Sequence, residues 1–256
     1  MKKYIIFLLS LTMLPALAAA SEDLRGLDIG GEITLINVAD ENTFGVGPVI
    51  RYENSFGDLS VYFKAKQIFN FDDPFLQVTY LEGKLAYNLP VGVPGNLSIV
   101  AWSVNEIARQ GGNTASWGFF EPGVKYAQEF GFGTVFLMPG FSIWYESDTD
   151  ARRNNLFLTI GYSNKRFGVE IKGWYNRDDS NIWMYELLLN YTTNLFFAEL
   201  TANTNYSKEF DSFNLTPYVE LFITDSISLW LEIGFENIGG PGGASVTPSI
   251  GAFYRF

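Results

Sequence analysis

Apolar and polar residues alternate along most of this chain, and turn-forming residues interrupt the alternation at regular intervals. In the last stretch, VTPSIGAFYRF, the apolar parity holds Val246, Ile250 and Tyr254, and the other parity is mostly polar or small. A period of two is typical of a β-strand with one apolar face. Fourteen strands are predicted, over Leu27–Ile36, Phe44–Glu53, Leu59–Asn70, 76–89, 96–108, Trp117–Gln128, Thr134–Glu146, Leu156–Ser163, Phe167–Asn176, Ile182–Tyr191, Leu195–Tyr206, Phe213–Ile223, Ile227–Glu236 and Val246–Phe256.

Two of these segments fit the pattern less well. Residues 96–108 carry apolar groups on both parities, so their apolar face is undetermined. Residues 76–89 change phase between Tyr80 and Leu81, which a β-bulge would explain. If one hairpin is misread, the number of strands falls from 14 to 12.

Charges in the middle of the strands avoid the apolar parity. Glu232, for example, alternates with Leu231 and Ile233. A soluble β-sandwich would show the same alternation, but tyrosines also lie near strand ends on the apolar parity, as a belt at a membrane interface would require. These are Tyr52, Tyr87, Tyr126, Tyr145, Tyr162, Tyr175, Tyr191, Tyr206 and Tyr254. The pattern therefore favours an all-β, antiparallel, up-and-down barrel that crosses a membrane.

The chain ends on an aromatic residue, with Tyr254 and Phe256 on the same face of the last strand. This ending resembles the terminal strand of bacterial outer-membrane β-barrels. The resemblance implies that outer-membrane lipid surrounds the barrel and that the barrel-assembly machinery recognises Tyr254 and Phe256. The hairpin layout through residue 163 is also similar to that of the nucleoside-channel porins, which have 12 strands. No shared motif allows functional residues of that family to be assigned to positions of this sequence.

The first 20 residues have the pattern of a secretory signal peptide: Lys2 and Lys3, a short apolar run, and the small residues that end at Ala20. We therefore predict a signal peptide over 1–20, a barrel over 21–256, and an outer-membrane location. The sequence has no cysteine, which excludes a lipid anchor on cysteine and a disulfide framework.

The loops are predicted to fall into two sets. Those after even-numbered strands are tight, and those after odd-numbered strands are longer and more polar, as in 109–116, 147–153 and 238–245. This asymmetry indicates short periplasmic turns, longer outer loops and periplasmic termini.

Composition and charge exclude several functions. The net charge is −11 and becomes −13 without Lys2 and Lys3, which argues against a nucleic-acid partner. The chain has no histidine, on which the phospholipase, acyltransferase, deacylase and protease barrels of the outer membrane depend. The pair Glu232 and Glu236 is better explained as lumen charge than as acid–base machinery. Asp72–Asp73, Asp148–Asp150 and Asp178–Asp179 are better explained by turns than by Ca²⁺. No catalytic residue, metal or cofactor is predicted.

Nineteen charged residues fall on the lumen parity, and acids outnumber bases by twelve to seven. The predicted pore-lining residues are Arg51, Glu53, Lys64, Lys66, Glu82, Lys84, Glu121, Lys125, Glu170, Lys172, Glu186, Glu199, Glu220 and Glu232; the other five are Asp28, Glu32, Glu146, Glu236 and Arg255. Five aromatic residues share this face: Tyr62, Trp144, Trp174, Tyr218 and Trp230.

Three functions are compatible with such a lumen. The first is a diffusion channel of the porin kind for small hydrophilic solutes, with a weak preference for cations. The second is a non-conducting barrel, either structural or a surface receptor, in which the lumen charges pair with one another. The third is a channel whose aromatic residues and acids bind a sugar or nucleoside.

Overall fold

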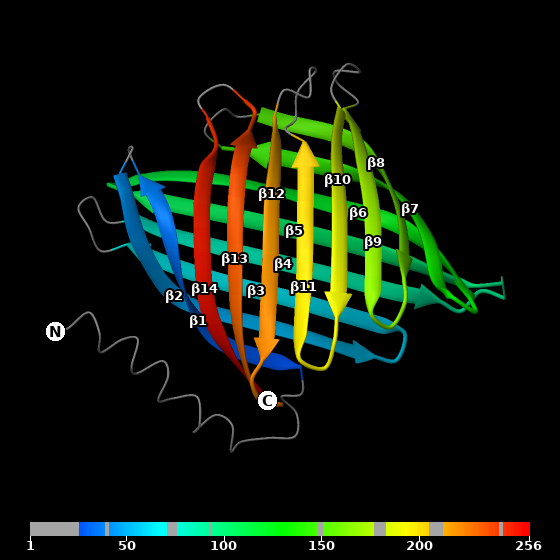
Figure 1. Ribbon diagram of the computed structural model, residues 1–256. Coiled ribbons are helices and arrows are strands. Elements are labelled where there is room, and N and C mark those ends of the chain that lie inside the picture. The colour runs from blue at the N-terminus through cyan, green and yellow to red at the C-terminus, as the bar shows by residue number, and fades with distance from the viewer. Residues whose placement is uncertain are drawn as a thin grey trace.

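The computed structural model describes residues 26–38, 41–70, 76–92, 94–147, 151–176, 183–204, 212–240 and 243–256. These residues form a closed antiparallel β-barrel in which each strand pairs with its neighbours in sequence (Figure 1). The strands are β1 (Leu27–Val38), β2 (Glu41–Phe56), β3 (Leu59–Asn70), β4 (Leu76–Leu89), β5 (Asn96–Gln110), β6 (Asn113–Phe130), β7 (Gly133–Glu146), β8 (Ala151–Ser163), β9 (Phe167–Asn176), β10 (Trp183–Thr192), β11 (Phe196–Thr204), β12 (Phe213–Phe222), β13 (Ile227–Ile238) and β14 (Ser245–Arg255). The prediction of 14 strands is confirmed, and the alternative of 12 is wrong.

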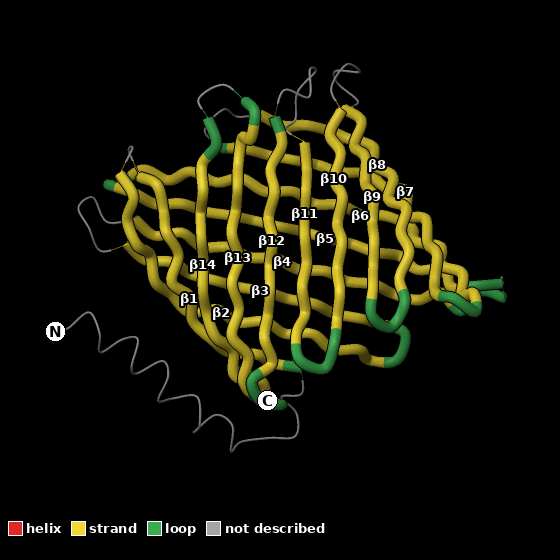
Figure 2. Tube along the Cα trace, in the orientation of Figure 1, coloured by secondary structure: helices red, strands yellow, loops and turns green. Residues whose placement is uncertain are grey.

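Pairing between the first and last strands closes the barrel. The register runs from Asp28 opposite Arg255 to Thr34 opposite Ser249. The described sheet is therefore a continuous wall, which Figure 2 shows in yellow with loops in green at its two rims. Closure matters because an unpaired strand edge would leave backbone polar groups unsatisfied in lipid.

The two faces of the wall are chemically opposite. Mid-strand apolar residues such as Leu158 and Leu231 are each 44% exposed on the outside. Carboxylates of the opposite parity are buried inside the barrel, and Glu121 and Glu220 are only 3% and 2% exposed. This is the arrangement of a barrel surrounded by lipid rather than water. In the described part of the chain, no helix is long and apolar enough to cross a bilayer.

The two poorly patterned segments are regular strands. β4 pairs with β3 and β5 without a register shift from Leu76 to Leu89, so the predicted bulge near Tyr80 is wrong. The apolar parity appeared to change along the strand because Val78 and Tyr80 lie on the inner face, the same face as Glu82. In β5, Ile99 is 51% exposed and Val104 is 3% exposed, which assigns the odd positions to the outside.

A register shift does occur between β12 and β13. Phe213 pairs with Ile238 but Leu215 pairs with Phe235, so β13 contributes an extra residue there. Asn237 has a φ of 56°, a left-handed conformation that asparagine tolerates better than most residues. Its backbone N–H donates to Asn214 Oδ1 at 2.9 Å, which compensates for the interrupted ladder.

The loop predicted at 109–116 is a two-residue turn. Gly111 and Gly112 have φ values of 55° and 88°, the positive pair that a type I′ hairpin turn requires. β5 and β6 therefore continue to Gln110 and restart at Asn113.

The described ends of the chain meet at one rim, where Asp28 pairs with Arg255. The turns after the even-numbered strands lie at this same rim, because neighbouring strands are antiparallel. Most longer loops of the other rim, the three aspartate pairs and the predicted signal peptide fall wholly or partly outside the described residues.

Candidate functional site

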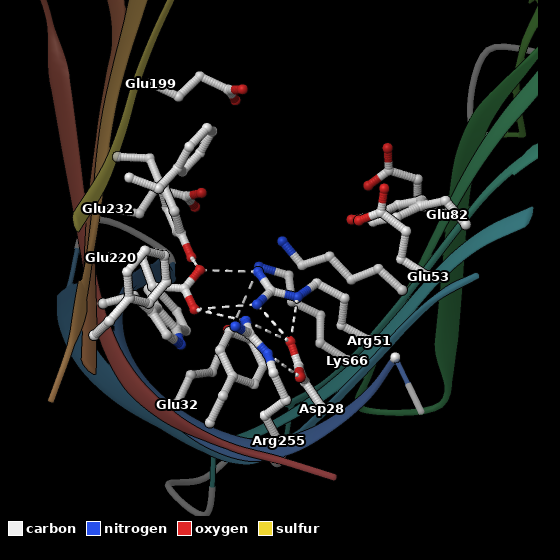
Figure 3. A pocket seen from close by; sticks show the side chains of 18 of the residues that line it. Asp28, Glu32, Arg51, Glu53, Lys66, Glu82, Glu199, Glu220, Glu232 and Arg255 are labelled. Atoms are coloured by element: carbon white, nitrogen blue, oxygen red, sulfur yellow. Dashed lines mark hydrogen bonds and ion pairs between the residues drawn. The ribbon is translucent and has the colours of Figure 1, made fainter. Parts of the chain in front are cut away.

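A polar cavity of about 710 Å³ lies inside the barrel, against the wall formed by β1–β4 and β10–β14 (Figure 3). Seven acidic and five basic side chains line it, so its formal charge is −2 if all are ionised. The charged residues are Asp28, Glu32, Arg51, Glu53, Lys64, Lys66, Glu82, Lys84, Glu199, Glu220, Glu232 and Arg255.

Arg51 is the centre of an ionic network at the rim where the described ends of the chain meet. Its Nε and Nη2 donate to Asp28 Oδ2 at 2.9 and 2.5 Å. Its Nη1 and Nη2 donate to Glu220 at 3.0 and 3.1 Å. The guanidinium also lies over the Phe253 ring, 4.5 Å from the centroid. One planar fork of donors thus joins two carboxylates that are almost fully buried.

Strand closure positions the other members of this network. Asp28 has Arg51 and Arg255 as its cross-strand neighbours on β2 and β14. Arg255 Nε donates to Asp28 Oδ1 at 3.0 Å, and its Nη2 lies 3.7 Å from Glu220. Glu220 also accepts from the hydroxyls of Tyr218 and Ser228 at 2.9 and 2.6 Å. The network ties β12, β13, β14, β1 and β2 together across the seam of the barrel.

A second group of charges lies on β3 and β4. Glu82 accepts from Trp102 Nε1 at 3.0 Å and from the Tyr80 hydroxyl at 3.1 Å, and Lys84 Nζ lies 3.3 Å from it. Lys84 also lies over the Trp102 ring, 4.5 Å from the centroid. The partners of Glu82 therefore come from its own strand and from β5.

Lys66 and Glu32 form a further pair inside the cavity, with Nζ 3.5 Å from Oε1. Glu32 is 1% exposed, so Lys66 supplies a charge partner for a carboxylate that is removed from water.

Aromatic rings cover one side of the cavity. Phe197, Tyr218, Trp230 and Phe253 follow one another from β11 to β14, with neighbouring ring centroids 6.0 to 6.2 Å apart. Tyr62 lines the cavity from β3.

A packed cluster lies on the other side of the barrel interior, on β6–β10. Glu121 accepts from Lys172 and from Trp174 Nε1, the latter at 2.6 Å. Lys172 is 5% exposed and lies over the rings of Phe157 and Trp174. Phe157 and Trp174 in turn pack with Met184 and Trp144, so the buried ion pair borders an apolar cluster.

The predicted pore-lining residues divide between these two sides of the interior. Nine of the fourteen line the cavity: Arg51, Glu53, Lys64, Lys66, Glu82, Lys84, Glu199, Glu220 and Glu232. The other five, Glu121, Lys125, Glu170, Lys172 and Glu186, have the inward parity of β6, β9 and β10 but are not part of the cavity wall. Among the predicted lumen aromatics, Tyr62, Tyr218 and Trp230 line the cavity, whereas Trp144 and Trp174 belong to the packed cluster.

Several cavity residues were not singled out from the sequence as site residues. Phe197 and Phe253 share their strand parity with Glu199 and Arg255, so alternation alone could have placed them inside. Phe222, the last residue of β12, likewise shares its parity with Glu220. Among the described residues, no group of three or more acidic side chains has the arrangement of a metal site.

No family model and no curated protein matches this chain. Solved structures match it in fold. Omp33 of Acinetobacter baumannii aligns with a TM-score of 0.51 and 11% identity over 91% of this chain and 98% of that one. The toluene transporter TodX of P. putida aligns with a TM-score of 0.50 and 10% identity over 94% and 92% of the two chains. Outer membrane phospholipase A of Escherichia coli aligns with a TM-score of 0.50 and 14% identity over 70% and 79%. The chain therefore has the porin-like fold of bacterial outer-membrane β-barrels.

Proposed function

We propose that this protein is an outer-membrane channel through which small hydrophilic solutes diffuse, with a weak preference for cations. The observation that carries the proposal is the cavity of about 710 Å³, lined by twelve charged side chains and enclosed by an apolar outer wall. Charged side chains are stable inside a barrel when water solvates them, because burying an unpaired charge away from water costs free energy.

The preference for cations follows from the charges of the cavity wall. Its seven acids and five bases leave an excess of two negative charges. A narrow passage with low-dielectric walls concentrates ions of the opposite sign. The excess is small, so selectivity is expected to be weak.

A non-conducting structural barrel is the second candidate, because two ionic clusters occupy the interior. The Arg51 network crosses the seam, and the Glu121–Lys172 pair lies on the opposite side of the interior. In this alternative the clusters close the lumen and stabilise the wall. A sugar- or nucleoside-binding channel is a third candidate, and the stacked Tyr218 and Trp230 in the cavity wall favour it.

An enzymatic function is not part of the proposal. Outer membrane phospholipase A resembles this chain only in fold, and the sequence has no histidine to serve as a general base.

The test is single-channel conductance of the refolded protein in a planar bilayer under a KCl gradient. We expect discrete current steps and a reversal potential on the cation-selective side. Glu232→Gln is expected to move that potential towards zero, because it removes one of the excess negative charges from the cavity wall. Asp225→Asn, in the exposed β12–β13 turn, is the matched control. A folded barrel that passes no current would refute the channel and favour the structural alternative.

A further inference from the structure

The cavity holds charges of both signs that its own network does not neutralise. Eight of its twelve charged residues have an ionic partner: Asp28, Glu220, Arg51 and Arg255 in the seam network, Glu32 with Lys66, and Glu82 with Lys84. The remaining four are Glu53, Glu199, Glu232 and Lys64, and none has an ion pair or hydrogen bond to a side chain in the described part of the protein. Three carboxylates and one ammonium group are therefore available to a solute.

Lys64 lacks an ionic partner because its cross-strand neighbour is already engaged. Glu82 lies opposite Lys64 in the β3–β4 register, but its oxygens are held by Trp102, Tyr80 and Lys84. Lys64 instead lies over the Tyr80 ring, 5.9 Å from its centroid. The strongest Coulombic attraction on its ammonium group comes from Glu232, on β13.

The available carboxylates lie on two sides of the cavity. Figure 3 shows Glu199 and Glu232 together on one side and Glu53 on the other, with open space between them. Glu199 is attracted most strongly by Lys84 and then by Lys64, although neither contacts it directly. These charges thus act on one another across the cavity.

Aromatic rings lie beside the charged positions. Phe197 and Tyr218 lie on the side of Glu199, their rings 6.1 Å apart. Tyr62 is the cross-strand neighbour of Glu53. Such rings favour methylene groups and cationic groups that lie against their faces. The volume of the cavity is within the range of small-molecule sites.

We propose that the cavity binds basic α-amino acids, that is, solutes with one carboxylate and two cationic groups. In this arrangement Lys64 binds the carboxylate, Glu199 and Glu232 bind one cationic group, and Glu53 binds the other. Aromatic rings contact the aliphatic segment between them. The solute replaces the missing partners: it carries one negative and two positive charges, against one positive and three negative charges in the wall. The inference rests on the proposed channel, for which it names the substrate class.

The test measures binding separately from conduction. Isothermal titration calorimetry on the refolded protein compares L-lysine with cadaverine, which lacks the carboxylate, with L-norleucine, which lacks the second amine, and with glucose. We expect L-lysine to bind about threefold to tenfold more tightly than cadaverine and L-norleucine, since each partly solvated charge contact contributes modestly. Glucose is expected to bind more weakly than all three.

Variants assign the charge contacts to residues. Lys64→Gln should weaken L-lysine binding about threefold to tenfold and leave cadaverine binding unchanged or stronger. Glu232→Gln and Glu199→Gln should weaken the binding of both solutes. Lys165→Gln and Asp225→Asn, in exposed turns, are the matched controls. Circular dichroism checks that each variant has folded.

The outcomes separate this inference from the proposed channel. A barrel that conducts KCl but binds L-lysine no better than L-norleucine or glucose would overturn the inference and leave the channel standing. Equal loss of L-lysine and cadaverine binding in Lys64→Gln would also overturn it, because Lys64 would then not contact the carboxylate of the solute. Binding of L-lysine with the expected variant pattern, in a protein that passes no current, would support the site and refute the channel.

Discussion

Removing the positive charge of Arg51 is expected to destabilise the barrel at its seam. Arg51 donates four hydrogen bonds, two to Asp28 and two to Glu220. These carboxylates are 4% and 2% exposed, so they cannot recover the lost contacts from water. Arg51→Met keeps an unbranched, mostly aliphatic side chain and removes the charge and all four donors.

The size of the effect follows from what remains at each carboxylate. Asp28 keeps Arg255 at 3.0 and 3.4 Å, and Glu220 keeps two hydroxyl donors and Arg255 at 3.7 Å. Breaking a buried ion pair by removing one partner costs about 3–5 kcal/mol, and the remaining donors favour the lower end. We therefore expect the free energy of unfolding to fall by about 3 kcal/mol.

The assay is reversible urea unfolding of the barrel in phospholipid vesicles, followed by tryptophan fluorescence. Arg255→Met is the control, because its side chain belongs to the same network but is 43% exposed, and its loss should cost no more than about 1 kcal/mol. A loss below about 1 kcal/mol for Arg51→Met, or equal losses for the two variants, would refute the reasoning that burial makes Arg51 the essential partner.

Three further predictions concern the packed cluster, the lipid-facing wall and the end of the chain. Glu121→Gln and Lys172→Met should each lower the free energy of unfolding by about 3 kcal/mol in the same assay, while the double variant should lose less than the sum; full additivity would contradict a coupled buried pair. Leu231→Arg, in the middle of β13, should cost about 2–4 kcal/mol in vesicles, and Ile227→Arg, at the end of the same strand, about 0–1 kcal/mol; equal costs would argue against a depth-dependent lipid contact. Phe256→Ala should reduce the amount of assembled protein in the outer membrane, measured in membrane fractions, without preventing refolding in vitro; an unchanged amount would show that the assembly machinery does not recognise this ring, which packs edge-on against Tyr254.

The sequence predicts the number, order and alternation of the strands, because lipid and lumen impose opposite requirements on alternate residues. Glu232 and Leu231 were assigned to opposite faces from this rule, and the structure places them there. The rule failed where both faces are apolar. Tyr80 and Val104 face a lumen that accepts aromatic and aliphatic side chains, so their strands gave an ambiguous pattern.

The pairing of charges could not be predicted from the sequence. Arg51 and Glu220 are 169 residues apart, and nothing in either strand specifies that they meet. Strand parity placed both inside the barrel, but their contact depends on closure of β1 against β14 and on the tilt of the strands. The same holds for Trp174: strand parity places it inside the barrel but does not show that it belongs to the packed cluster rather than the cavity.

The account depends most on the claim that the inward parity faces water in the cavity while the outward parity faces lipid. The chain has no cysteine, so single cysteines can be introduced without background. The measurement is the rate at which a membrane-impermeant, positively charged thiol reagent modifies cysteines at Leu229, Leu231, Glu232 and Lys64 in proteoliposomes. We expect fast modification at Glu232 and Lys64 and slow modification at Leu229 and Leu231. Fast modification at the two leucine positions, or none at any of the four, would contradict a water-filled barrel.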